Sequence, residues 1–294
     1  MKAHKPAAMT TMRCLSIAAV LILLSQIPLY AGVSGKKKPK PAAPPKRKPV
    51  SEKAYKKVTN ETALEMLKKY QSIKTYRSVW QSELKQGGQE WKLECETAYE
   101  RKSGKTLFVI WTFLKKDDQL VPMGGQLLVY DGEKQHAGAS QMAGRPMRKK
   151  VRTISDPDSF TYRDFRKGLS HVYPVDLPML YPDHALTEYP LMEILQASLK
   201  DIKVTGPDSK APAKMITLEL MTDGTCVRMH LDPKTMIINY FAYFRKNAGI
   251  MPGTEFKQVS CEINKPIKPE LFDFKTHLKS FEVIKPVEPP KKQQ

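Results

Sequence analysis

The side chains with catalytic or metal-binding chemistry are spread along this chain without a known motif. None of the six histidines forms HExxH or shares a metal-binding spacing with a cysteine. A glycine-rich phosphate loop and the GxSxG elbow of hydrolases are also missing from the sequence. Asp156, Asp158 and Asp164 lack the spacing of a calcium loop and suit turns instead. We therefore expect no enzyme, no metal site and no cofactor.

The cysteines predict buried thiols rather than a disulfide framework. Three of the four, Cys95, Cys226 and Cys261, follow the N-terminal segment, and an odd number leaves one unpaired in a monomer. In the strand order predicted below, Cys226 and Cys261 lie two strands apart. That separation is roughly 9–10 Å, which is too far for a disulfide bond.

Residues 1–31 predict a secretory signal peptide. Basic residues precede an apolar run from Leu15 to Leu24, and Leu29-Tyr30-Ala31 resembles a cleavage site. The run is short for a membrane span, so an uncleaved anchor is the less favoured alternative. We expect an exported protein of the periplasm or cell envelope.

The basic charge of the chain is concentrated at its ends. Of the formal net charge of +19, the Lys/Pro-rich segment Val33–Lys57 carries +9. Such a composition predicts a disordered linker over 32–57 and a disordered tail over 285–294, flanking one domain over 58–284. Nucleic acid is not an expected partner. The linker is a solubilising spacer or touches an anionic membrane or cell-wall surface through charge alone.

A four-stranded antiparallel meander is the clearest pattern in the chain. Apolar residues alternate over 213–222 and 225–231, and Asp223-Gly224 between them is typical of a two-residue hairpin. Two further strands are predicted at 235–246 and 254–264. The strand 235–246 is apolar on both faces, so both faces must be covered. The cover is either a helix and a loop or, on one face, a ligand cleft.

The rest of the domain predicts an α+β fold. A helix capped by Thr59 or Asn60 precedes strands at about 74–86, 90–101, 106–114, 125–131, 134–139 and 149–154. A second helix is predicted to begin at Pro190 and a strand to cover 202–206. We expect one curved antiparallel sheet, an incomplete barrel, with helices packed on its concave face.

Residues 155–188 interrupt this pattern with four prolines, at positions 157, 174, 178 and 182. Long irregular segments of this kind are often functional lids. This one contains many large apolar residues, so we expect it to pack onto the domain. They include Phe160, Tyr162, Phe165, Val172, Tyr173, Leu177, Leu180 and Tyr181.

The order of these elements resembles the LolA/LolB-like lipoprotein carriers over about residues 60–276. The similar phrases are LVYDGEKQH at 128–136, YPLMEILQASLKDIKV at 189–204, HLDPKTMIINYFAYF at 230–244 and FKQVSCEINKPIKPELFDF at 256–274. The resemblance implies an incomplete β-barrel closed by a helical lid, with an apolar cavity for acyl chains. It also implies that Arg101 holds the lid, although Lys102 stands where the carriers have proline.

The function implied is non-catalytic binding of an acyl chain or a lipidated protein in an apolar cleft. The residues expected to line it are Trp80, Trp91, Leu107, Val109, Trp111, Phe113, Tyr240 and Phe244. The same residues could equally form an ordinary core. The alternative is therefore a cell-envelope scaffold or interaction protein of the same fold whose core is filled.

Overall fold

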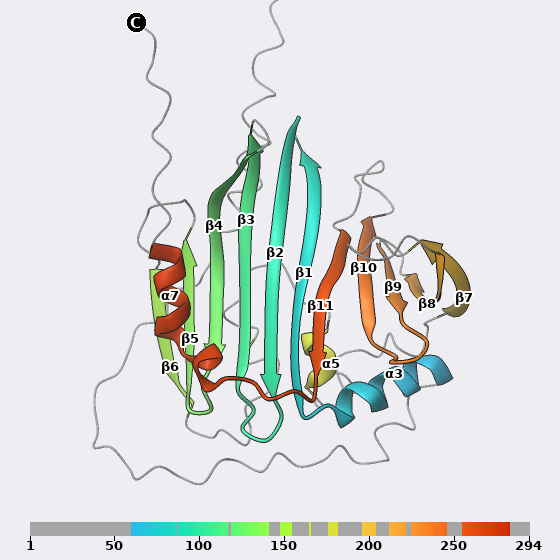
Figure 1. Ribbon diagram of the computed structural model, residues 1–294, viewed down its shortest axis with the longest axis horizontal. Coiled ribbons are helices and arrows are strands. Elements are labelled where there is room, and N and C mark those ends of the chain that lie inside the picture. The colour runs from blue at the N-terminus through green and yellow to red at the C-terminus, as the bar shows by residue number, and fades with distance from the viewer. Residues whose placement is uncertain are drawn as a thin grey trace, which may run out of the picture.

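The computed structural model describes residues 60–86, 88–116, 119–140, 148–154, 165, 176–181, 196–203, 212–221, 225–245 and 255–282. The predicted signal peptide and linker, the start of the predicted domain and the tail lie outside these residues. The described part is mostly one antiparallel sheet with few helices (Figure 1).

Each strand pairs with the next one along the chain within two groups, β1 to β6 and β7 to β11, and one pairing, that of β1 with β11, is long-range. Their order across the open sheet is β6-β5-β4-β3-β2-β1-β11-β10-β9-β8-β7. The bounds are β1 Thr75–Gln86, β2 Gln89–Glu100, β3 Thr106–Lys116, β4 Gln119–Tyr130, β5 Lys134–Ser140, β6 Arg148–Thr153, β7 Gln196–Lys203, β8 Pro212–Met221, β9 Thr225–Leu231, β10 Ile238–Arg245 and β11 Glu255–Ile263. The pairing of β1 with β11 joins the two halves of the domain.

The predicted strand pattern is confirmed for both halves. The C-terminal meander forms β8 to β11, and Met221 pairs with Cys226 across the first hairpin. Its turn at 222–224 lies outside the described residues. In the other half, the turn between β4 and β5 contains Gly132 with φ +103°, a conformation that favours glycine.

Within the described residues, four helical segments accompany the sheet: α3 Glu61–Ser72, α5 Leu177–Leu180, the 3₁₀ turn η3 Pro269–Phe272 and α7 Phe274–Glu282. Of the two predicted caps of the first helix, Asn60 is the one used, because its Oδ1 accepts the backbone N–H of Ala63 at 2.9 Å. The buried stripe of α3 is Ala63, Met66, Leu67 and Tyr70. This spacing gives the helix one apolar face that packs on the sheet.

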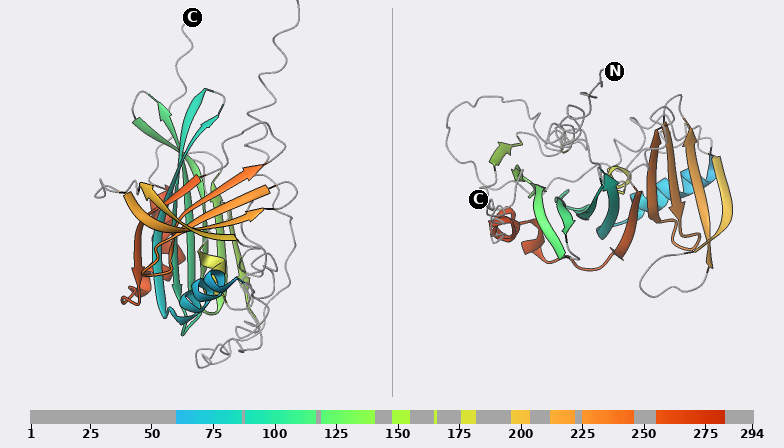
Figure 2. Two further views of the ribbon diagram at one scale, coloured as in Figure 1. Left: turned by 90° about the vertical axis from the view of Figure 1, so that its right-hand side faces the viewer. Right: turned by 90° about the horizontal axis from the view of Figure 1, so that it is seen from above.

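The sheet has two apolar faces. We define the inner face as the one that carries Trp80, and the outer face as the one that carries Val109. The inner core contains α3, α5 and residues from β1 to β4 and β8 to β11, whereas the outer core lies under η3 and α7. Seen from above, the sheet bends around α5 and leaves α7 outside (Figure 2).

Two predictions about the helices were wrong. Residues 196–200, expected to be helical, belong to β7, where Leu199 pairs with Ile216 of β8. The rest of that predicted helix, 190–195, lies outside the described residues. A short apolar run fits either period, and here pairing with the meander decided the outcome. Nor do all helices lie on the concave face, because α7 packs on the outer face.

Candidate functional site

The eight residues expected to line a cleft do not share one surface. Trp80 is buried on the inner face, and Trp91, four residues from Cys95 on β2, is half-buried on the same face. Leu107 and Val109 are buried in the outer core, Trp111 packs against that core, and Phe113 follows on the same side of β3. Tyr240 also faces outward, while the side chain of Phe244 lies outside the description.

The error has a physical cause in β3. Its sequence, TLFVIWTFLKK, is apolar on both faces, so alternation alone cannot say which face turns inward. Pairing with β2 decides it: Ile110 lies opposite Cys95, and Val109 lies opposite Glu96. The inner-face residues of β3 are therefore Phe108 and Ile110.

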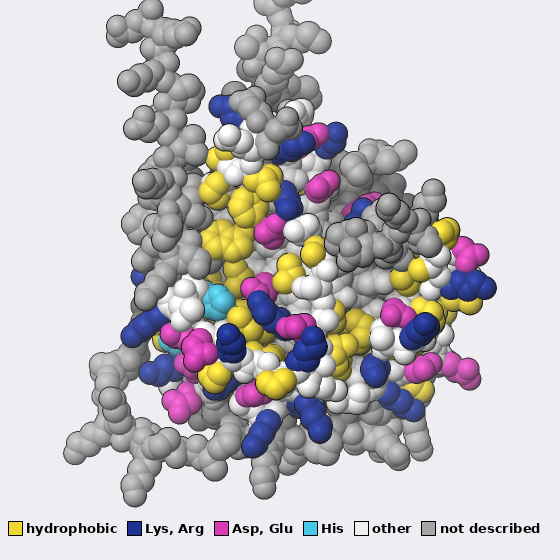
Figure 3. Space-filling model, in the orientation of Figure 1, with side chains coloured by type: hydrophobic (Ala, Val, Ile, Leu, Met, Phe, Trp, Pro, Cys, Tyr) yellow, Lys and Arg dark blue, Asp and Glu magenta, His cyan; other side chains and the backbone are white. Residues whose placement is uncertain are grey.

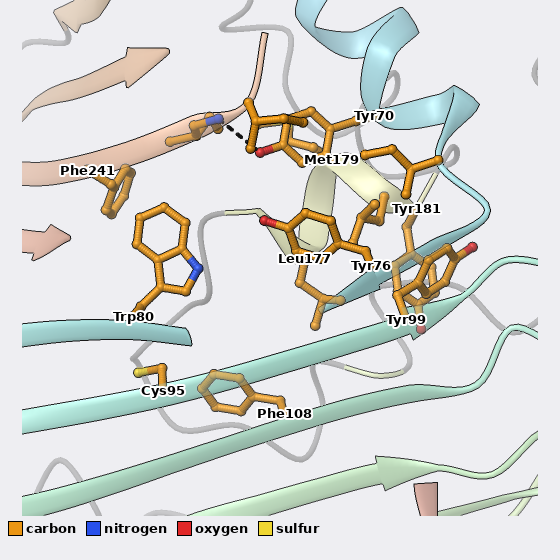
Figure 4. Close-up of a cluster of buried hydrophobic side chains, with 14 of the residues drawn as sticks. Tyr70, Tyr76, Trp80, Cys95, Tyr99, Phe108, Leu177, Met179, Tyr181 and Phe241 are labelled. Atoms are coloured by element: carbon orange, nitrogen blue, oxygen red, sulfur yellow. Dashed lines mark hydrogen bonds between the residues drawn. The ribbon is translucent and has the colours of Figure 1, made fainter. Parts of the chain in front are cut away.

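The inner face is covered by a segment that we call the inner-face segment, Asp176–Tyr181. All six of its residues are buried, and Leu177, Leu180 and Tyr181 have no exposed surface. The hydroxyl groups of Tyr181 and Thr106 are 2.5 Å apart, and Gln71 Nε2 donates to the carbonyl of Met179 at 2.6 Å. Figure 4 shows Leu177, Met179 and Tyr181 in one cluster of buried side chains with Tyr76 and Tyr99. The prediction that residues 155–188 pack onto the domain is confirmed for its described members, including Phe165.

The carboxylate of Asp176 begins the segment in a buried polar cluster. Its Oδ2 accepts from Ser78 Oγ at 2.5 Å, Tyr76 Oη at 2.7 Å and Trp80 Nε1 at 2.8 Å. Thr97 Oγ1 donates at 3.3 Å. Asp176 is fully buried, and its Oδ1 has no hydrogen-bond partner. Sequence reasoning missed this residue, because its four donors lie 79–100 positions away.

Arg101 holds the other end of the segment. Its guanidinium donates to the carbonyls of Ile73 at 2.7 Å and Tyr70 at 3.0 Å, which end α3. The same group donates to the carbonyl of Leu180 in α5 at 3.2 Å. Its Cζ lies 5.4 Å from the centre of the Tyr99 ring. Arg101 thus links β2, α3 and the inner-face segment.

The titratable groups near Asp176 are held in their neutral forms. Burial, followed by the charge of Asp176, raises the pKa of Tyr76 well above its usual value. Burial raises the pKa of Cys95 strongly and that of Cys261 to about 12. Both thiols are free, and both stay protonated at neutral pH, where a thiol is a poor nucleophile. No group of three or more potential metal ligands occurs within the described residues.

The outer face of β8 to β10 carries a second aromatic cluster. His230 stacks on Tyr240 with ring centroids 4.3 Å apart. Partial burial, and then the neighbouring charges of Arg228 and Lys200, lower the pKa of His230 to about 4. The strand predicted at 235–246, now β10, was expected to be covered on both faces. On its outer face, part of that cover is the ring of His230 stacked on Tyr240.

We expect the free energy of unfolding to depend on His230 in mild acid. The folded pKa of about 4 lies below the ordinary value of 6.5, so the unfolded chain binds the proton more readily between these values. Stability should fall as the pH falls from about 6.5 towards 4. In His230→Phe, urea-unfolding midpoints at pH 7 and pH 4.5 should differ less than in the wild type. Tyr240→Phe retains the ring and should keep the wild-type difference; equal pH dependence in His230→Phe and wild type would contradict the assignment.

Comparisons with known proteins give a likeness only to solved structures. No protein-family model matches the chain, and no curated protein matches it. The Pseudomonas aeruginosa MucA/MucB complex aligns at 10% identity and TM-score 0.35, covering 74% of this chain and 60% of that one. The alignment therefore spans less than two thirds of the length of the matched chain.

Two further structures align over nearly all of their own length. A DUF1329 family protein from Desulfovibrio piger aligns at 12% identity and TM-score 0.28, covering 77% of this chain and 98% of its own. A beta-barrel-like protein of the domain of unknown function DUF1849 from Brucella abortus aligns at 10% identity and TM-score 0.30, covering 66% and 99%. Among the helices of the described residues, none has the length and apolar character needed to cross a membrane.

Proposed function

We propose that this chain is an exported, non-catalytic binding protein that holds an acyl chain or a lipidated protein on its inner face. The observation that carries the proposal is the buried inner-face segment. It places an apolar run, Leu177–Tyr181, on an aromatic surface and is held there by polar contacts at its two ends. A ligand that takes the place of this segment would meet the buried apolar site that the helical turn α5 now fills.

The energetics allow such an exchange. Each buried methylene contributes about 0.8 kcal/mol, so ten methylenes supply several kcal/mol after the cost of ordering the ligand. That gain can offset the loss of the contacts of Leu177–Tyr181, which are of the same apolar kind. In this reading the segment is a lid, and Arg101 holds it closed, as the resemblance to the carriers implies. The N-terminal sequence supports export to the periplasm or cell envelope, and the 33–57 linker supports contact with an anionic surface.

The second candidate is a scaffold or interaction protein with a filled core. One observation favours it: Trp80, Phe108 and Tyr181 are each at most 2% exposed, so the chain itself packs the described inner face. The two candidates differ in whether the segment leaves. Binding requires it to leave, whereas a scaffold requires it to stay.

Native mass spectrometry of the full chain purified from cells, followed by lipid extraction, separates the two. We expect a bound mass in the range of a fatty acid or phospholipid, or uptake of an added fluorescent hydrophobic probe. Uptake should increase in Arg101→Ala, because the segment loses the hydrogen bond from the Arg101 guanidinium to the carbonyl of Leu180. A ligand-free mass with no probe uptake by either protein would overturn the proposal in favour of the scaffold.

A further inference from the structure

The cluster around Asp176 is made of neutral donors from two adjacent strands. Tyr76, Ser78 and Trp80 alternate along the inner side of β1, and Thr97 lies opposite Ser78 on β2. All four are at most 2% exposed. Hydroxyl and indole N–H groups that converge on one oxygen in a dry site stabilise an anion without a cation.

The donors are also oriented by their neighbours. Gln258 Nε2, on β11, lies 3.2 Å from the Tyr76 hydroxyl and donates to it, which leaves the tyrosine proton for Asp176. The hydroxyls of Ser78 and Thr97 are 2.6 Å apart, and Trp80 Nε1 lies 2.9 Å from Ser78 Oγ. The strands therefore hold these groups in place independently of the segment that supplies Asp176.

Asp176 fits this site incompletely. Its Oδ2 takes all four donors, whereas its buried Oδ1 has no partner, which is costly for a carboxylate. After Asp176, the chain continues into the buried apolar run Leu177–Tyr181. A carboxylate head followed by an apolar tail, both buried on the inner face, has the chemical outline of a long-chain carboxylic acid.

We propose that Tyr76, Ser78, Trp80 and Thr97 form a carboxylate-binding site, and that the ligand of the inner face is a long-chain carboxylic acid whose carboxylate displaces that of Asp176. This inference rests on the proposed function and adds the chemical class of the ligand to it. Asp176 acts as a tethered competitor. The apparent dissociation constant of the acid is then its intrinsic value divided by the fraction of molecules in which Asp176 has left the site.

The test compares palmitate with methyl palmitate, which has the same tail but no carboxylate, by equilibrium dialysis against the full chain at pH 8. The wild type should bind palmitate at least about tenfold more tightly than the ester, because an ester cannot supply the charged acceptor. Asp176→Ala should bind palmitate about tenfold more tightly than the wild type. The double variant Asp176→Ala/Thr97→Val keeps the shape of the Thr97 side chain but lacks its hydroxyl. It should bind palmitate more weakly than Asp176→Ala and bind the ester equally well.

Ser82→Ala is the matched control for the second substitution. Ser82 is buried on the inner side of β1, two residues beyond Trp80, and its Oγ has no partner, so its loss should change neither affinity. If Asp176→Ala does not fold, Asp176→Asn replaces it. The ratio of the dissociation constants of palmitate and methyl palmitate for the wild type then tests the carboxylate site. Equal binding of acid and ester would overturn the carboxylate site while leaving the proposed function standing. Binding of neither ligand to any folded variant would overturn both.

Discussion

Arg101→Ala should unfold at a clearly lower urea concentration than the wild type, with a loss of about 2–3 kcal/mol in the free energy of unfolding. The substitution leaves the carbonyls of Tyr70, Ile73 and Leu180 without their charged donor. Two of these carbonyls lie at the C-terminal end of α3, where backbone partners become few. The carbonyl of Tyr70 keeps one other donor, the backbone N–H of Ile73 at 3.2 Å. The free energy of unfolding is obtained by linear extrapolation from urea titrations followed by circular dichroism.

Two further variants show whether the stability lost in Arg101→Ala comes from the geometry of the guanidinium or from its charge. Arg101→Lys should restore less than half of the loss in unfolding free energy. A single ammonium group cannot reach all the carbonyls that the wider, planar guanidinium of Arg101 binds in α3 and in the inner-face segment. Arg77→Ala is the matched control: its side chain is 44% exposed and pairs with Glu96, so its removal should cost at most about 1 kcal/mol. Equal losses in Arg77→Ala and Arg101→Ala would show that Arg101 does not link α3 to the inner-face segment.

Phe108→Ala should be the most destabilising of the substitutions considered, with a loss of about 3–5 kcal/mol. Phe108 is fully buried on the inner side of β3, against the core that contains α3 and α5. Truncating it removes the transfer energy of the ring and leaves a cavity that a packed sheet cannot collapse to fill. Chemical denaturation monitored by tryptophan fluorescence measures the loss.

Phe113→Ala provides a control of identical chemistry on the same strand. Phe113 is half-buried on the outer side, so less apolar surface is lost and solvent can reach the vacated space. We expect a loss of about 1–2 kcal/mol. A loss in Phe113→Ala as large as that in Phe108→Ala would mean that the difference in burial between these two positions of β3 does not set the cost of truncation. Figure 3 shows apolar side chains gathering on the near face of the molecule as well. The comparison of Phe113→Ala with Phe108→Ala therefore tests whether partly exposed apolar side chains contribute as much to stability as buried ones.

Local sequence determined the elements whose signals are local. The Asn60 cap and the i, i+3, i+4, i+7 stripe specified α3, because both depend on residues within two turns. Period-two alternation and the Asp131-Gly132 turn specified the β4–β5 hairpin in the same way. The helix α7 was not predicted, although Asp273 precedes an apolar i, i+4 pair, Phe274 and Leu278. In the structure, Asp273 Oδ1 accepts the backbone N–H of Lys275 at 3.0 Å.

Tertiary structure alone decided the candidate site. Alternation marks two faces of β3 but cannot say which one turns inward, since this depends on its register with β2. The apolar run that ends in Leu199 has no unique period, and pairing with β8 made it a strand. The four donors to Asp176 and the carbonyls bound by Arg101 meet only after β1, β2, α3 and the inner-face segment have packed together. Local patterns therefore specify most strands and turns, whereas the contacts of Asp176 join residues 79–100 positions apart and form only when the chain has packed.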